Sequence, residues 1–151
     1  MKAMTVKDLM VRNPTVISPD ATLREAAAKM KSIDCGILPV GTKGKVTGTI
    51  TDRDIVIRAL SSSKDPALEK VGDHMTAKVQ FCKETDTIKQ AATLMKKHGI
   101  SRLLVKNGGN SVTGILSFGR ILREVHDLDE IAEVMTGVKH RVTGVKHRKA
   151  A

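Results

Sequence analysis

The chain has 151 residues, of which 40% are apolar, and it carries a formal net charge of +10 at neutral pH. It has no apolar run close to the roughly 20 residues that a membrane-spanning helix needs, and its N-terminus has no apolar signal stretch. We therefore expect a cytoplasmic protein with no membrane partner. Half of the positive excess lies in residues 136–151, which contain no acidic residue. Only Phe81 and Phe118 are aromatic, which argues against base stacking of the kind that single-strand nucleic-acid binders use.

A unit of about 60 residues occurs twice in the chain, at an offset of 65 to 66 residues. Each copy opens with an Asp–X–Met motif, continues with a helix-forming stretch and then contains two β-prone runs. The matching stretches are Val6–Met10 with Val71–Met75, Thr22–Met30 with Thr87–Met95, Leu38–Val40 with Leu103–Val105, and Val46–Gly48 with Val112–Gly114.

In chain order, the first copy begins with a short β-prone segment at residues 15–17. A helix is predicted from Thr22 onward, because Thr22 and Glu25 form a capping box. Apolar residues then recur at helical spacing, which indicates one buried face. This apolar stripe consists of Leu23, Ala26, Ala27, Met30 and Ile33.

Two β-prone runs follow this helix, at residues 36–40 and 45–51, with a glycine-flanked turn at 41–44 between them. A second helix is predicted to begin near Asp52. Residues 61–66 are polar and end in proline, which is typical of a linker.

The second copy repeats the pattern. It has a β-prone segment at residues 79–82, a helix capped by Thr87 and Gln90, a turn at 107–110 and a second helix from near Phe118. The apolar stripe of its first helix consists of Ile88, Ala91, Ala92 and Met95.

One β-α-β-β-α unit is too small to bury both faces of its sheet. We therefore expect an α/β (α+β) fold in which the two repeats pack sheet to sheet about a pseudo-two-fold axis. The expected divisions are a first repeat at 1–63, a second repeat at 64–128, and a C-terminal helix extension with a basic tail at 129–151.

The junction between the last strand and the second helix of the first copy carries the residues best suited to ligand binding. Thr51 stands at the expected helix N-cap, and Asp54 lies one turn further in. These two residues would suffice as a structural cap near the positive end of the helix. The same geometry also suits a nucleotide, because a carboxylate can accept hydrogen bonds from a ribose diol while Thr51 and Arg53 reach phosphate. No nucleophile–base pair or metal cluster accompanies them in the sequence, so binding is favoured over catalysis.

Over about residues 4–128 the chain resembles a tandem pair of cystathionine-β-synthase (CBS) domains, known as a Bateman module. The resemblance rests on the two Asp–X–Met openings, the Leu38–Val40 strand, and the Gly48-x-x-Thr51-x-x-Asp54 run, which is similar to the family's nucleotide signature. It implies that Asp54 binds the ribose hydroxyls and that Thr51 contacts ribose or phosphate. The implied adenine slot is lined by Thr15, Val16, Ile37, Leu38 and Pro39.

The same resemblance implies a function. The protein would be a non-catalytic regulatory module that senses AMP, ADP, ATP or NAD in the cleft between the repeats, with no other cofactor required. Because no further functional domain is expected, its output would pass through a homodimer interface or to an unknown protein bound in trans.

The second copy departs from the nucleotide signature. Ser117 is kept, but Arg120 stands where the first copy has aspartate. A guanidinium group has no acceptor for ribose hydroxyls, so we expect one ribose-reading site per chain. Arg120 and Arg102 are expected either to face the shared cleft and hold the phosphates of a nucleotide on the first copy, or to be solvated.

Two alternative functions stay open at this point. Cys35 and Cys82 are either buried apolar residues or a redox pair in a ligand-free stress-response scaffold. The tail repeats Thr-Gly-Val-Lys-His-Arg at 136–141 and 143–148, which suits a basic arm that binds nucleic acid. The spacing of its two histidines does not predict a metal site.

Overall fold

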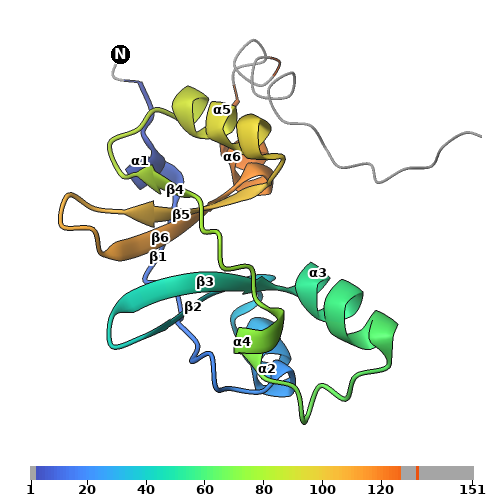
Figure 1. The fold of residues 1–151 in the computed structure, drawn as a ribbon. Helices are drawn as coiled ribbons and strands as arrows, with labels where there is room; N and C mark the ends of the chain where they lie inside the picture. Colours follow the sequence, from blue (N-terminus) through green and yellow to red (C-terminus); the bar gives the residue numbers. More distant parts are fainter. Residues whose placement is uncertain (1–2, 127–131, 133–151) are drawn as a thin grey trace, which may run out of the picture.

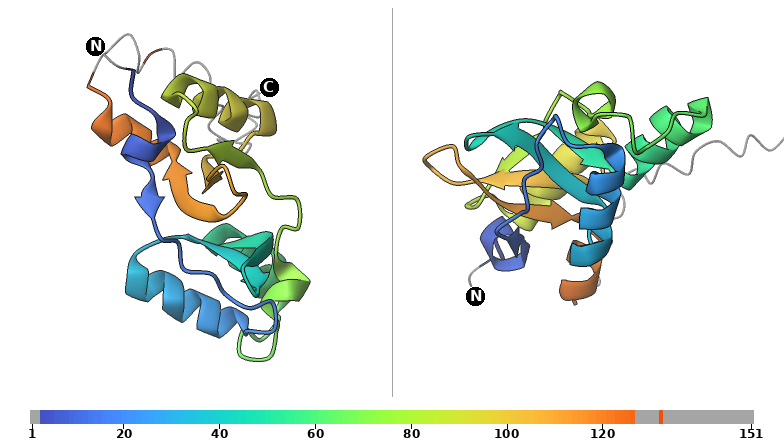
Figure 2. Two further views of the ribbon diagram at one scale, coloured as in Figure 1. Left: turned by 90° about the vertical axis from the view of Figure 1, so that its left-hand side faces the viewer. Right: turned by 90° about the horizontal axis from the view of Figure 1, so that it is seen from below.

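The computed structural model describes residues 3–126 and residue 132. Two lobes face each other through their sheets, and the helices cover the outer sides (Figures 1 and 2). This is the predicted α+β arrangement of two similar units packed sheet to sheet. None of the helices in the described ranges is long and apolar enough to cross a membrane. The predicted C-terminal extension and basic tail lie outside the described residues, apart from residue 132.

The lobe of the first copy contains one long helix, a two-stranded antiparallel sheet and a helical run that changes its winding twice. Its elements are α2 (Leu23–Ile33), β2 (Ile37–Thr42), β3 (Lys45–Thr51), α3 (Asp52–Asp54), the π-helix η1 (Ile55–Ala59) and the 3₁₀-helix η2 (Leu60–Ser62).

The lobe of the second copy has the same layout around a wider sheet. Its elements are β4 (Phe81–Lys83), α5 (Ile88–His98), β5 (Arg102–Lys106), β6 (Val112–Ser117) and α6 (Phe118–Glu124). Three short elements open the two copies: α1 (Val6–Leu9) and β1 (Val11–Arg12) in the first, and α4 (Val71–His74) in the second.

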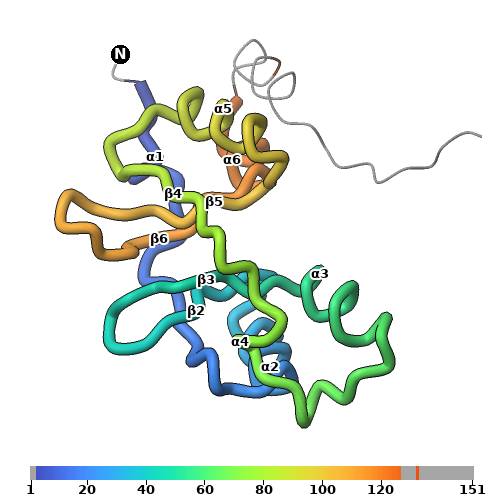
Figure 3. Tube along the Cα trace, in the orientation of Figure 1, coloured from blue at the N-terminus to red at the C-terminus, as the bar shows by residue number. Residues whose placement is uncertain are grey.

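Each lobe is completed by the segment that opens the other copy. Strand β1 pairs antiparallel with β6, so the order in the four-stranded sheet is β1-β6-β5-β4. Reciprocally, Thr76 bridges Thr49 of β3 through two backbone hydrogen bonds of 2.8 and 2.9 Å. The chain trace shows α1, which precedes β1, beside the second lobe and α4 beside the first (Figure 3).

The buried side chains follow this exchange. Val6, Leu9 and Met10 belong to the core of the second lobe, whereas Val71 belongs to the core of the first lobe, with Met75 packed against it. The expected limits 1–63 and 64–128 therefore describe sequence repeats and not the units that pack together.

A third apolar cluster lies between the two sheets. Its buried members are Ile37 from β2, Leu104 from β5 and Ile115 from β6, with half-buried residues of both lobes around them. In β2, Ile37 faces this cluster while the next residue, Leu38, faces the core of the first lobe, because successive side chains of a strand point to opposite faces.

Both capping boxes are confirmed. The Thr22 hydroxyl accepts a hydrogen bond from the Glu25 amide at 3.1 Å, and the Glu25 carboxylate accepts one from the Thr22 amide at 2.7 Å. The second copy repeats this between Thr87 and Gln90 at 3.1 and 2.8 Å. The boundary of β3 and the starts of the second helices, at Asp52 and Phe118, also agree with the prediction.

Two details of the predicted elements are wrong. Residues 15–17 do not form a strand: only Ile17 pairs, through an isolated parallel bridge to Val40, and the segment is bounded by Pro14 and Pro19, which have no N–H for a ladder. The buried stripe of α2 is also narrower than expected, because this helix covers a two-stranded sheet. Its outer members, Ala27 and Ile33, are exposed.

Candidate functional site

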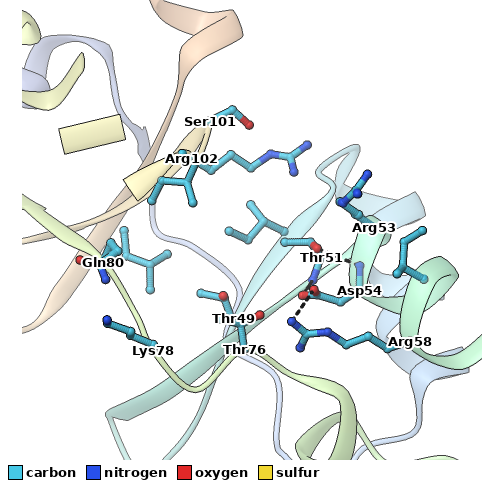
Figure 4. A pocket seen from close by; sticks show the side chains of 15 residues that line it. Thr49, Thr51, Arg53, Asp54, Arg58, Thr76, Lys78, Gln80, Ser101 and Arg102 are labelled. Carbon is cyan, nitrogen blue, oxygen red and sulfur yellow. Dashed lines mark hydrogen bonds and ion pairs between the residues drawn. The ribbon is translucent and has the colours of Figure 1, made fainter. Parts of the chain in front are cut away.

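A cavity of about 630 Å³ opens between the lobes, where β3 ends and the second helix of the first copy begins. This volume falls in the range of small-molecule sites, roughly 300–1,000 Å³. Four aliphatic side chains supply its apolar lining: Ile37, Ile57, Ile100 and Leu104. Polar and charged side chains from both lobes surround this apolar part (Figure 4).

Thr51 and Asp54 line this cavity and form a reciprocal cap at its edge. The Thr51 hydroxyl accepts a hydrogen bond from the Asp54 amide at 3.1 Å, and Oδ2 of Asp54 accepts one from the Thr51 amide at 3.0 Å. The structural role expected from the sequence is therefore present. This cap leaves two polar groups able to contact a ligand: the Thr51 hydroxyl can still donate its hydrogen, and Oδ1 of Asp54 can still accept a hydrogen bond.

Oδ1 of Asp54 lies 3.6 Å from an Nη atom of Arg58, one helical turn further on. The carboxylate is 13% exposed and the arginine side chain 44%. Arg58 also donates a hydrogen bond of 2.9 Å to the backbone carbonyl of His74, at the end of α4. His74 in turn contacts Glu69 through its ring, with 2.7 Å between Nε2 and Oε2. A continuous set of polar contacts thus joins the cavity edge to the segment between the two copies.

Positive charge dominates the polar lining. Arg53, Arg58, Lys78 and Arg102 all line the cavity, whereas Asp54 is its one acidic residue among the described lining residues. Arg102 comes from the second lobe and lies 3.8 Å from the carboxylate of Asp52, so this pair links the lobes at the cavity. Of the two placements considered for Arg102 from the sequence, the structure shows the one that faces the shared cleft.

The segment that crosses from α4 to β4 supplies residues that the sequence reasoning missed. Thr76, Lys78 and Gln80 line the cavity from this segment. Thr76 lies beside Thr49, and Lys78 and Gln80 lie on the side away from Thr51 and Asp54 (Figure 4). They were missed because the adenine slot was assigned to residues of the first copy alone. The signal was present in the repeat: the offset of 65 residues makes Gln80 the counterpart of Thr15, which was expected in the slot.

Of the five residues expected in the adenine slot, the structure brings only Ile37 to this cavity. Leu38 is fully buried in the core of the first lobe, because it lies on the opposite face of β2. Pro39 is buried further along the strand, where its carbonyl accepts a hydrogen bond from the Ile17 amide. Thr15 and Val16 precede that contact and do not line the cavity; the Val16 side chain is 48% exposed.

Ser117 and Arg120 also lie away from this cavity. Ser117 caps α6 by accepting a hydrogen bond from the Arg120 amide at 3.1 Å. The Arg120 side chain neither faces the shared cleft nor is simply solvated: its Nε donates a hydrogen bond to the backbone carbonyl of Leu9, at the end of α1. Arg120 is therefore occupied in holding the exchanged segment of the first copy.

The two cysteines are free and pack in different apolar clusters. Cys82 is buried in the core of the second lobe, and burial together with the nearby charge of Asp86 raises its pKa to about 12. A reactive thiol needs the opposite shift, because the thiolate is the nucleophile. The half-buried Cys35 donates its S–H to the carbonyl of Ile37 at 3.4 Å.

Comparison with known proteins gives matches over most of the chain. The model of the CBS domain family matches twice, at residues 6–61 and 71–127. The CBS domain-containing protein YhcV of Bacillus subtilis is 29% identical over 137 residues, which make up 91% of this chain and 96% of YhcV.

Two solved structures are similar in both fold and sequence. The CBS domain pair of protein MJ0100, in complex with 5′-methylthioadenosine and S-adenosyl-L-methionine, has a TM-score of 0.73 at 28% identity and matches 81% of this chain and 95% of that one. Hypoxic Response Protein I, with two coordinated zinc ions, has a TM-score of 0.70 at 28% identity, over 81% of this chain and 99% of its own. In the described part of the present chain, no group of three or more His, Cys, Asp or Glu residues is arranged to hold a metal ion.

Proposed function

The chain belongs to the CBS-domain family, and we propose that it is a non-catalytic regulatory module that binds an adenine nucleotide in the cavity between its lobes. The observation that carries the proposal is the Thr51–Asp54 pair, which opens on a cavity of about 630 Å³ with an aliphatic part and a cationic part. The described lining residues include neither His nor Cys, and Asp54 is their one carboxylate, so an acid–base or nucleophilic pair is not assembled there.

In this proposal each part of the ligand meets a matching part of the cavity. The adenine ring lies among Ile37, Ile100 and Leu104, where it loses contact with water. The ribose hydroxyls donate to Oδ1 of Asp54, which the capping hydrogen bond leaves available beside Arg58. The phosphates lie toward the arginine and lysine side chains.

The excess of cations favours a ligand with more than one phosphate. Four cationic side chains and one carboxylate give the lining a net positive charge, so ADP and ATP should bind more tightly than AMP, which carries less negative charge. S-adenosylmethionine carries a positive sulfonium group and should bind weakly in the same cavity, although it is present in the MJ0100 complex.

Isothermal titration of the full chain with ATP, ADP, AMP, NAD and S-adenosylmethionine tests this proposal. Asp54→Asn is the sharpest variant, because the amide oxygen can still cap Thr51 while the charge is lost. We expect ATP affinity to fall about 10- to 100-fold, the cost of losing a charged hydrogen bond. The matched control is Asp20→Asn, an acidic residue whose side chain is 82% exposed. Equal affinities for wild type and Asp54→Asn would contradict the ribose assignment, and no heat with any of these ligands would contradict the nucleotide proposal.

We further propose that the output of the module is self-association through the helical run that begins at Asp52. Val56 and Leu60 lie four residues apart on this run and are 52% and 49% exposed, which is unusual for large apolar side chains so close together. Ile57, between them, lines the cavity, so a bound ligand contacts the same helix. Light scattering should detect a dimer that Leu60→Glu dissociates; a monomeric wild type would contradict this output.

A further inference from the structure

A second opening lies between the tips of the two β-hairpins, at the far end of β3 from the nucleotide cavity. It measures about 390 Å³, and we refer to it as the hairpin notch. We propose that the hairpin notch binds a small phosphorylated solute. The residues that line it are Lys43, Gly44, Lys45, Val46, Phe81, Lys106, Asn110 and Val112.

The charge of the hairpin notch points to an anion. Three of its residues, Lys43, Lys45 and Lys106, are cationic, and none of the described lining residues is acidic. Neither Lys43 nor Lys45 has an ion-pair partner among the described residues, so their charges are not neutralised within the lobe. Three ammonium groups around one opening repel one another, and a bound phosphate relieves that repulsion.

Lys43 occupies a backbone conformation that its residue type disfavours. The turn between β2 and β3 consists of Lys43 and Gly44, whose φ angles are +48° and +77°. Positive φ at both positions defines the type I′ hairpin turn, where Asn followed by Gly is the preferred pair. A lysine at this position lowers stability relative to asparagine. In our proposal the lysine is kept because its ammonium group lies at the opening and contacts the ligand.

Lys106 is positioned by the second hairpin. It follows a register shift in the pairing of β5 with β6, and such a bulge redirects the side chain that follows it. Its Nζ lies 5.1 Å from the centre of the Phe81 ring, a cation–π contact that holds the ammonium group at the notch.

The base of the hairpin notch is preformed. Val46, Phe81 and Val112 line it and also pack against the apolar cluster between the sheets, so they are held by both lobes. This apolar base and the limited volume favour a small molecule over an extended polymer. The proposal does not depend on the nucleotide cavity, which shares no residue with the notch.

Pyrophosphate is the probe, because it carries the anionic group without a base or a sugar. Amide shifts of the ¹⁵N-labelled full chain are followed during titration at constant ionic strength. We expect saturable shifts in residues 43–46 and 106–112, separable from any shifts around Thr51 and Arg102. Lys43→Asn and Lys106→Met should each weaken the hairpin response about two- to fivefold, as the loss of one charge contact predicts.

These variants are designed to leave the fold intact. Asn is the favoured residue at position 43 of this turn, so Lys43→Asn should be at least as stable as wild type. Met keeps the unbranched chain over Phe81 and removes only the charge. Lys29→Gln, an exposed position on α2, changes the net charge equally and should leave the response unchanged.

Three outcomes would overturn the proposal. The first is the absence of saturable shifts at the two hairpins. The second is an equal weakening by Lys29→Gln, which would mean that only net charge matters. The third is a single-stranded RNA oligomer that binds the same amides far more tightly than pyrophosphate. Asp54→Asn, which tests the nucleotide cavity, should leave the hairpin response unchanged, so the two proposals fail separately.

Discussion

Arg58 and Arg120 make the same kind of contact from two different positions in the repeat. Each donates a hydrogen bond to the carbonyl at the end of the exchanged helix, Arg58 to His74 and Arg120 to Leu9. His74 and Leu9 are repeat counterparts, but the two arginines are not, because Arg120 stands at the position of Asp54. The first lobe therefore has a carboxylate together with its arginine, whereas the second lobe has the arginine alone.

This difference predicts the effect of restoring the aspartate. Arg120→Asp should lower the free energy of unfolding by about 1–3 kcal/mol, because the Leu9 carbonyl loses a charged donor. It should not create a second nucleotide site, since Glu124 stands where the first copy has Arg58. Urea denaturation and calorimetric stoichiometry test both parts. Arg123→Asp, the same charge change at an exposed position, should cost less; a stoichiometry of two ligands per chain would contradict the prediction.

Cys82 should be inert as a thiol. Its pKa is raised to about 12, so it stays protonated in the folded chain, while the unfolded chain ionises near the ordinary value of 9.0. The raised pKa contributes stability that is fully present below pH 9 and is lost as the pH rises toward 12. Iodoacetamide at pH 8.5 should therefore modify Cys35 well before Cys82. Above pH 9 the free energy of unfolding should fall less steeply for Cys82→Ala than for wild type, because the variant has no thiol that ionises on unfolding. Equal labelling of the two cysteines would instead favour the redox alternative.

At the scale of elements, the local structure followed from the sequence and the exchange of segments did not. The capped helices and β3 were predictable because Thr22, Thr87 and the helical spacing act over a few neighbouring residues. The placement of Thr76 against Thr49 depends on a contact between different copies, which no local pattern reports. The same limit applies to the candidate site: Thr51, Asp54 and Arg102 were found, whereas Thr76, Lys78 and Gln80 were not.

Two glycines make the exchanged contacts close enough to form. A Cβ built on Gly48 would lie 2.8 Å from the Thr76 carbonyl oxygen and 2.8 Å from Sδ of Met75. At Gly114, the repeat counterpart, it would lie 3.0 Å from the Val11 carbonyl oxygen and 2.6 Å from Sδ of Met10. In both lobes the strand thus has no room for a side chain where the other copy's segment crosses it.

Gly48→Ala should therefore destabilise the protein by about 1–3 kcal/mol, the usual cost of overpacking. It should also weaken nucleotide binding, because the carbonyl that must move belongs to Thr76, a lining residue of the cavity. Thermal unfolding and titration with ATP measure the two effects. Gly108→Ala is the control, since a Cβ there meets nothing within 4 Å. If both variants unfold at the same temperature as wild type, the close approach at Gly48 does not require a glycine, and the prediction is wrong.

At the scale of the whole molecule, the apolar cluster between the sheets connects the two proposed sites. Ile37 and Leu104 belong to this cluster and line the nucleotide cavity, whereas Val46, Phe81 and Val112 pack against it and line the hairpin notch. Strand β3 begins at the notch with Lys45 and ends at the cavity with Thr51. A ligand in either site therefore contacts both lobes and should stabilise their association.

The exchange of segments also predicts which pieces of the chain can fold. A fragment of residues 1–63 lacks Val71, which is fully buried in the core of the first lobe, and it exposes Val6 and Leu9, whose partners lie in the second lobe. A fragment of residues 13–78 contains the complete first-lobe core and omits residues 1–12, of which Val6, Leu9 and Met10 pack in the core of the second lobe. Both fragments uncover Ile37 and its face of the sheet, so they differ mainly in the exchanged parts.

Circular dichroism in urea should show a cooperative transition for 13–78 and a weaker or absent one for 1–63, because losing one or two buried apolar side chains costs about 2–5 kcal/mol. A cooperative transition of 1–63 at the same midpoint would mean that the sequence repeats, and not the exchanged lobes, are the folding units.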